Sequence, residues 1–121
     1  MSVFIFAPGV NQPGAVLPDA SIIPVNNDGT INESDIVAKA AYIHISPYVG
    51  IELGDRVTCL QEILGGTWID FLDVIDPQDT LKVLVRPVNR NGGSYTKISY
   101  SVQRVDGGDV GHSGQRHYDV V

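Results

Sequence analysis

The stretch SYTKISYSVQRV, residues 94–105, limits the fold more than any other part of the chain, because its residues alternate strictly between two sides. Side chains of a β-strand point alternately to opposite faces of its sheet. One face would carry Thr96, Ile98, Tyr100 and Val102, and the other Lys97, Ser99, Ser101 and Gln103. The pattern predicts a strand with one buried face.

Shorter segments of the same kind are spread along the chain, separated by turn signals rich in glycine and proline. In AYIHI, Ala41, Ile43 and Ile45 share one face. We expect further strands over 21–25 (an edge strand, since Pro24 cannot donate to a ladder), 56–64, 67–76, 81–88 and 116–121, with Tyr118 and Val120 pointing inward in the last. The segments 11–18, 46–55, 89–93 and 106–115 are predicted to be loops or turns.

The segment TWIDFLDVID, residues 67–76, is open to two interpretations. Aspartates at every third position would lie near one side of a helix, whereas the β-branched and aromatic residues between them favour a strand. We favour the strand, with Trp68 in the core. The aspartates 70, 73, 76 and 79 would then form a solvated acidic edge.

About seven short strands without a convincing amphipathic helix predict an all-β fold, an immunoglobulin-like antiparallel β-sandwich. The length of 121 residues suits a single domain over 1–121, in which residues 1–20 form a more loosely packed segment. The single cysteine, Cys59, excludes an intrachain disulfide, and its apolar surroundings predict a buried thiol.

Charge and hydropathy restrict the partners and the location of the chain. A net charge of −6 argues against nucleic acids and anionic membrane surfaces, which attract clustered Lys and Arg. No segment has the roughly 20 apolar residues that a membrane helix needs, so no membrane insertion is expected. No classical signal peptide is predicted. The location stays open between the cell surface or a secreted assembly and the cytoplasm.

The stretch PVNNDGTINESD, residues 24–35, is similar to a calcium-binding loop. With Gly29 at the sixth position of such a loop, the ligands would be Asn26, Asp28, Asn32 and Asp35. However, Pro24 occupies the first position and has no side-chain oxygen, and Asp35 replaces the usual glutamate. We therefore favour a structural turn at 27–29 and predict no metal and no cofactor.

Other groups of reactive residues do not form a recognisable catalytic constellation. His112 and His117 would point to opposite faces of a strand, which keeps them and Asp119 from converging on a metal. His44 has no nearby serine or cysteine that could act as a nucleophile. We therefore expect a protein that is not an enzyme.

Three turn and strand motifs resemble a known family. They are Pro-x-x-Gly-x-x-x-Gly-Asp at Pro47, Gly50, Gly54 and Asp55; a Gly-Gly pair followed, after six residues, by Tyr-x-Val, at Gly92, Gly93, Tyr100 and Val102; and Asp-Gly-Gly at 106–108. Over residues 22–121 the chain is similar to bacterial immunoglobulin-like domains of invasin and intimin-like surface adhesins. It carries CLQEIL after Arg56 where that family usually has a tryptophan.

The resemblance implies a bacterial adhesion or binding module that recognises a protein or glycan partner. We expect recognition through the loops 46–55 and 106–115, with Tyr48, Trp68 and His112 as candidate binding residues. Two alternatives stay open: an assembly subunit of a phage or secreted particle, which would form homo-oligomers, and a small toxin-like effector.

Overall fold

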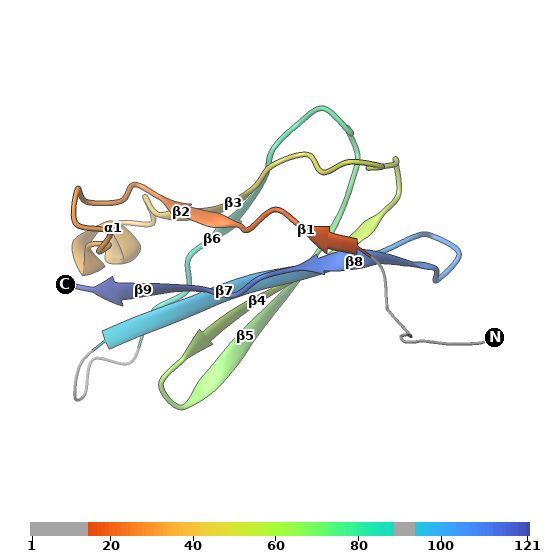
Figure 1. Ribbon diagram of the computed structural model, residues 1–121. Coiled ribbons are helices and arrows are strands. Elements are labelled where there is room, and N and C mark those ends of the chain that lie inside the picture. Colours follow the sequence, from red (N-terminus) through yellow and green to blue (C-terminus); the bar gives the residue numbers. More distant parts are fainter. Residues whose placement is uncertain (1–14, 89–93) are drawn as a thin grey trace.

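The computed structural model describes residues 15–88 and 94–121, which form a sandwich of two β-sheets (Figure 1). The larger sheet has the order β1-β8-β7-β4-β5, with β9 also paired to β7, and the smaller sheet has the order β2-β3-β6. The strands are β1 (Ala15–Leu17), β2 (Ser21–Ile23), β3 (Tyr42–Ile45), β4 (Arg56–Ile63), β5 (Gly66–Asp73), β6 (Leu81–Leu84), β7 (Ser94–Gln103), β8 (Asp109–Ser113) and β9 (Arg116–Val120). This strand order is that of an immunoglobulin-like sandwich, as the sequence predicts.

The first and last strands are each divided into two parts. Segment β1 pairs in parallel with β8, and after Pro18 the chain crosses to the smaller sheet, where β2 pairs antiparallel with β3. Segments β8 and β9 both pair antiparallel with β7. Counting each divided strand once gives seven strands among the described residues, in agreement with the expected number. The sandwich is mixed rather than purely antiparallel, because β1 is parallel to β8.

Two segments that were predicted to be loops contain strands. Residues 15–17 form β1, although the Pro18 that follows is typical of a turn. Residues 109–113 form β8, although the glycines in and around this segment, such as Gly111, are typical of loops. Their strand conformation depends on distant pairing, since Ala15 lies opposite Gly111. Leu17 and Ala20 are buried in the core. The predicted turn 89–93 and residues 1–14 lie outside the described residues.

The core lies between the two sheets and is formed by the faces that the alternation predicts. In β7, Thr96, Ile98, Tyr100 and Val102 are all buried. They face apolar residues of the smaller sheet, among them Ile22, Ile43, Ile45 and Val83. Cys59 is buried as predicted. Its burial and, to a smaller extent, the nearby charge of Asp70 raise the pKa of its thiol to about 12.

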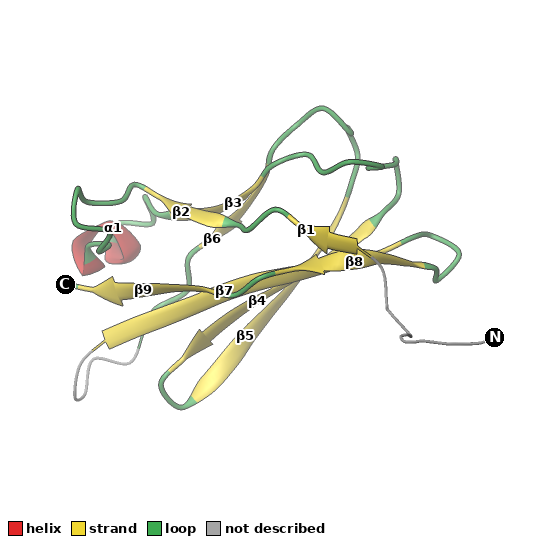
Figure 2. Ribbon diagram, viewed as in Figure 1, coloured by secondary structure: helices red, strands yellow, loops and turns green. Residues whose placement is uncertain are grey.

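The connection between β2 and β3 holds a short helix, α1 (Glu33–Val37), which the sequence did not indicate (Figure 2). Five residues are too few for a recognisable helical period. Ile36 of α1 is buried and attaches this segment to the core. No helix among residues 15–88 and 94–121 is long and apolar enough to cross a membrane.

Candidate functional site

Three loops meet at one end of the sandwich, and we refer to residues 46–55, 74–80 and 104–108 together as the loop end. The strand register explains why they meet. Arg56, the first residue of β4, lies opposite Asp73 at the end of β5 and opposite Gln103 at the end of β7. The segments that precede β4, follow β5 and follow β7 therefore leave the larger sheet at the same edge.

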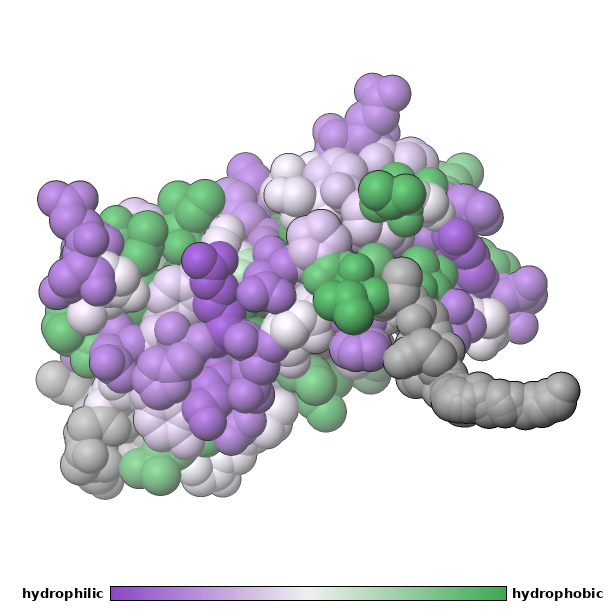
Figure 3. Space-filling view, in the orientation of Figure 1, coloured by the Kyte–Doolittle hydropathy of each residue, from purple (hydrophilic) through white to green (hydrophobic). Residues whose placement is uncertain are grey.

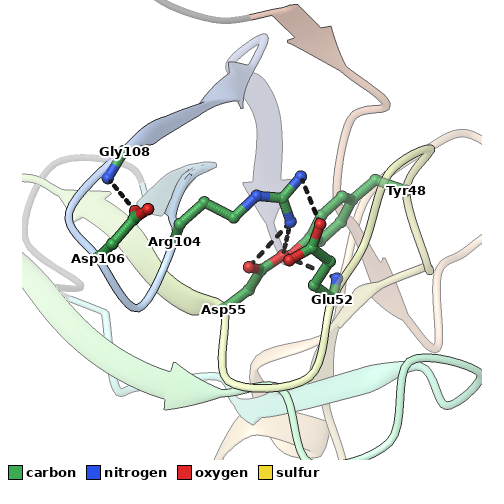
Figure 4. A network of polar contacts seen from close by, with 6 residues as sticks. All are labelled: Tyr48, Glu52, Asp55, Arg104, Asp106 and Gly108. Carbon is green, nitrogen blue, oxygen red and sulfur yellow. Dashed lines mark hydrogen bonds and ion pairs between the residues drawn. The ribbon is translucent and has the colours of Figure 1, made fainter.

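A buried carboxylate, Asp55, fixes the loop 46–55 to the loop 104–108 (Figure 4). One of its oxygens accepts hydrogen bonds from the Tyr48 hydroxyl at 2.9 Å and from the Glu52 backbone N–H at 3.0 Å. Both oxygens accept from the Arg104 guanidinium, at 3.0 and 2.8 Å. The same guanidinium lies 3.7 Å from a Glu52 carboxylate oxygen. Two loops that are far apart in the sequence are thereby joined through one side chain.

The surroundings of Asp55 keep it ionised. Burial by itself would raise its pKa, but the donors from Glu52, Arg104 and Tyr48 outweigh burial, so that the pKa of Asp55 lies below its ordinary value. Burial and the neighbouring carboxylate raise the pKa of Tyr48, which therefore stays protonated and donates to Asp55. The network is thus a structural support with a fixed charge state near neutral pH.

Gly54 allows the loops to approach each other closely. Its φ of +88° is a conformation that favours glycine, and a Cβ there would lie 2.6 Å from Cγ2 of Val105. This position is the second glycine of the Pro-x-x-Gly-x-x-x-Gly-Asp motif, and the buried Asp55 is its last residue. The motif therefore encodes the contact between the two loops.

A groove of about 610 Å³ opens at the loop end between these loops and the strand ends. Its apolar lining includes Leu53, Val74, Ile75 and Val105, and its polar lining includes Arg56, Asp73, Gln103 and Arg104. Arg56 pairs with Asp73 at 3.1 Å, just as Arg104 pairs with Asp55. Both guanidinium groups in the groove are therefore neutralised by carboxylates.

Four apolar side chains of the loop end are exposed, and three of them, Leu53, Ile75 and Val105, line this groove. Val49, Leu53, Ile75 and Val105 come from all three loops, and their exposed fractions lie between 67% and 99%. In the space-filling view, apolar side chains lie among hydrophilic ones at this end of the molecule (Figure 3). Single exposed apolar residues are common on proteins, but a group on adjacent loops is typical of an interaction surface.

The three binding residues predicted from the sequence do not come together. Tyr48 is buried and holds Asp55, so it is part of the support beneath the loops. His112 is exposed on the outer face of the larger sheet, opposite Ser101. Trp68 lies near the start of β5, at the opposite end of the sandwich from the loop end.

The prediction that Trp68 lies in the core is wrong, because its side chain is 42% exposed. Trp68 shares a face with the buried side of β4, but the smaller sheet has three strands and does not extend over β5. It lines a groove of about 450 Å³ with Pro87 and Val88. The Arg86 guanidinium lies 5.4 Å from the ring centroid and pairs with Asp70 at 2.6 Å.

The expected acidic edge is present only in part. Strand β5 is an edge strand, and Asp73 and Asp76 are exposed. Asp70 is instead turned toward the inner face, where its side chain pairs with Arg86 and is 23% exposed.

The turn predicted within residues 24–35 is confirmed. The Gly29 N–H donates to the Asn26 carbonyl, and the Asp28 carboxylate accepts from both the backbone and the hydroxyl of Thr30. These two bonds from Thr30 lower the pKa of Asp28. The amide groups of Asn26 and Asn32 bond to each other. The side chains considered as calcium ligands thus stabilise the turn itself. Asp35 takes part because its carboxylate accepts a hydrogen bond from the Asn32 amide.

Among the described residues, no group of three or more histidines, cysteines and carboxylates could hold a metal ion. His117 pairs with Asp119 at 2.7 Å and stacks on Tyr95, while His112 belongs to the preceding strand segment.

No family model, curated protein or solved structure matches the chain. The resemblance to adhesin domains therefore stays a prediction from sequence motifs. Four residues that define the loop end were not predicted from the sequence: Leu53, Ile75, Val105 and Arg104. The sequence does contain a signal that could have indicated them, because apolar residues occur there within segments that are otherwise typical of polar turns.

Proposed function

We propose that the protein is a non-enzymatic binding module that recognises a protein partner through the loop end. The observation that carries the proposal is the group of exposed apolar side chains, Val49, Leu53, Ile75 and Val105, on loops that Asp55 and Arg104 fix from below. Protein interfaces commonly have an apolar centre in which a few residues contribute most of the binding energy.

The internal network supports this proposal because rigid loops lose little conformational entropy on binding. Tyr48, Glu52 and Arg104 all contact Asp55, so the loop 46–55 is held against its neighbour before any partner arrives. The arginines in the groove are already paired, which favours a role in packing and recognition over proton transfer.

The charges around the apolar centre indicate the chemistry of the partner. Exposed carboxylates lie on all three loops of the loop end, at Glu52, Asp76, Asp79 and Asp106. Together with the net charge of −6, they favour a partner with an apolar centre and a basic rim. Association should then slow as salt rises, because screening removes the long-range attraction.

A glycan partner has less support. Its best site is the groove beside Trp68, since sugars stack on exposed aromatic rings. Arg86 already lies over that ring and is held there by Asp70. We therefore favour a protein partner, and specific binding on a glycan array that is lost in Trp68→Ala would reverse this preference.

The proposal is tested by quantitative affinity capture from the source cells with matched variants. Leu53→Asp combined with Ile75→Asp places charge in the apolar centre, while Val37→Asp changes an equally exposed residue on α1. We expect a partner that wild type and Val37→Asp retain and the double variant loses. Equal capture by all three proteins, each folded by circular dichroism, would remove the loop end as the binding surface.

A further inference from the structure

Strand β5 forms an open edge of the larger sheet (Figure 1). Among the described residues it pairs only with β4, over its full length from Gly66 to Asp73. Ile69 and Phe71 lie on its outer face and are more than half exposed. Proteins usually protect such edges, since a long apolar edge strand is a template for pairing with another chain.

The hydrogen-bond pattern of β5 identifies the residues whose backbone N–H and C=O groups face its open side. The Val74 N–H donates to the Asp55 carbonyl, so Val74 is bonded toward the β4 side. Along an antiparallel strand, successive residues direct their backbone N–H and C=O groups alternately toward and away from the paired strand. Thr67, Ile69, Phe71 and Asp73 therefore direct their N–H and C=O groups away from β4, toward any strand that adds to this edge.

We propose that β5 binds β5 of a second copy of this chain in antiparallel pairing, with the two-fold axis at Ile69. This pairing joins the two larger sheets into one continuous sheet. It does not depend on the loop end, which lies beyond Asp73 at the far end of the strand.

The register follows from cross-strand complementarity. An axis at Asp70 would place two carboxylates directly opposite each other, and an axis at Phe71 would place Ile69 opposite the charged Asp73. With the axis at Ile69, two isoleucines meet at the centre and Phe71 lies opposite Thr67, an aromatic and β-branched pair of the favoured kind.

The same register brings opposite charges together on the inner face. Trp68 of one copy lies opposite Asp70 of the second copy, and each Trp68 ring carries an Arg86 guanidinium at 5.4 Å. The Arg86 side chain is 43% exposed, so it can approach the second Asp70 while keeping its own. This alternation of Arg86 and Asp70 across the axis is what favours a second copy as the occupant.

The dimer should be weak. Eight strand residues on each side fall short of the roughly 20–30 residues per side of a standard interface, so we expect a dissociation constant on the order of 0.1 mM. Two copies with a charge of −6 each repel one another. Added salt should therefore tighten the dimer, the opposite of the salt effect expected for the basic partner.

Analytical ultracentrifugation of the full chain from about 10 µM to about 1 mM tests the proposal. Ile69→Pro removes one outward N–H and leaves the ladder with β4 intact, and we expect it to raise the dissociation constant at least about tenfold. Phe71→Lys should act in the same direction, whereas Val16→Lys, on the outer face of the far edge strand, should not. A wild type that stays monomeric at the highest concentration, or an Ile69→Pro variant that dimerises equally well, would overturn the proposal.

Oxidative trapping tests the register. Residue 69 would lie opposite itself at a Cα separation of about 5.5 Å, within the range that a disulfide spans. Ile69→Cys should therefore form a covalent dimer faster than Phe71→Cys, while the buried Cys59 stays unreactive. Faster trapping through Phe71→Cys, or none through either variant, would refute an axis at Ile69.

Discussion

Replacing Asp55 by asparagine removes the charge that holds the loop end together and leaves the side chain's shape almost unchanged. The carboxylate is 1% exposed and accepts hydrogen bonds from Tyr48, Glu52 and Arg104. An amide can accept from only one side, and its NH₂ group would face the Arg104 guanidinium. We expect Asp55→Asn to destabilise the fold and to loosen the loop 46–55.

The magnitude follows from the exposure of the two partners. Breaking a fully buried ion pair costs about 3–5 kcal/mol, because one charge is left without water or a partner. The Arg104 side chain is 27% exposed and recovers part of its hydration. We therefore expect a loss of about 2.5 kcal/mol, which corresponds to a Tm lower by roughly 10 °C for a domain of this size.

Urea and thermal unfolding, followed by circular dichroism, measure this loss. Asp106→Asn is the matched control, since Asp106 is exposed and accepts from Gly108 within its own turn. The control should lose less than about 0.5 kcal/mol. A loss below about 1 kcal/mol in Asp55→Asn would refute the reasoning, as would a double-mutant cycle without coupling to Arg104→Met.

The dependence on pH gives an independent check of the same carboxylate. The pKa of Asp55 is lowered in the folded protein, so its stabilisation is complete above the ordinary carboxyl pKa of about 3.9. It is lost as the pH falls through that value toward the folded pKa. The stability difference between wild type and Asp55→Asn should therefore shrink below about pH 4, and a difference that is constant down to pH 2 would contradict the assignment.

Three further predictions concern other parts of the fold. Gly54→Ala should destabilise by about 2–3 kcal/mol in urea unfolding, since its Cβ would meet Val105, whereas Gly65→Ala, which has a similar φ and open space, should lose only about 1 kcal/mol. The Cys59 thiol should react with a thiol reagent at pH 8 only after unfolding, and rapid labelling of the native protein would show that it is not buried. Trp68, the only tryptophan, should be quenched by acrylamide in the native state, and strong protection would place it in the core after all.

The fold could be predicted because its information is local. The alternation in residues 94–105 identifies the buried face of β7, and AYIHI does the same for β3. The turn at Asn26–Gly29 is likewise encoded by neighbouring residues. In each case the deciding contacts lie within the strand or turn that the sequence displays.

The errors arose where distant parts of the chain decide the outcome. Trp68 is exposed because the smaller sheet ends before it covers β5, and β8 is a strand because β7 and β1 pair with it. Neither fact is visible in the residues around Trp68 or Gly111. Leu53 and Val105 similarly meet only after the chain has folded, so the groove at the loop end could not be assembled from the sequence.

Recognition through the loop end is tested most directly by calorimetry, which measures binding between the captured partner, once purified, and the loop-end variants. We expect Leu53→Asp to weaken binding by about 2 kcal/mol, roughly a thirtyfold rise in Kd, and Val37→Asp to leave Kd unchanged. Equal affinities for wild type and Leu53→Asp, or a larger loss in Val37→Asp, would contradict the assignment of the loop end as the recognition surface.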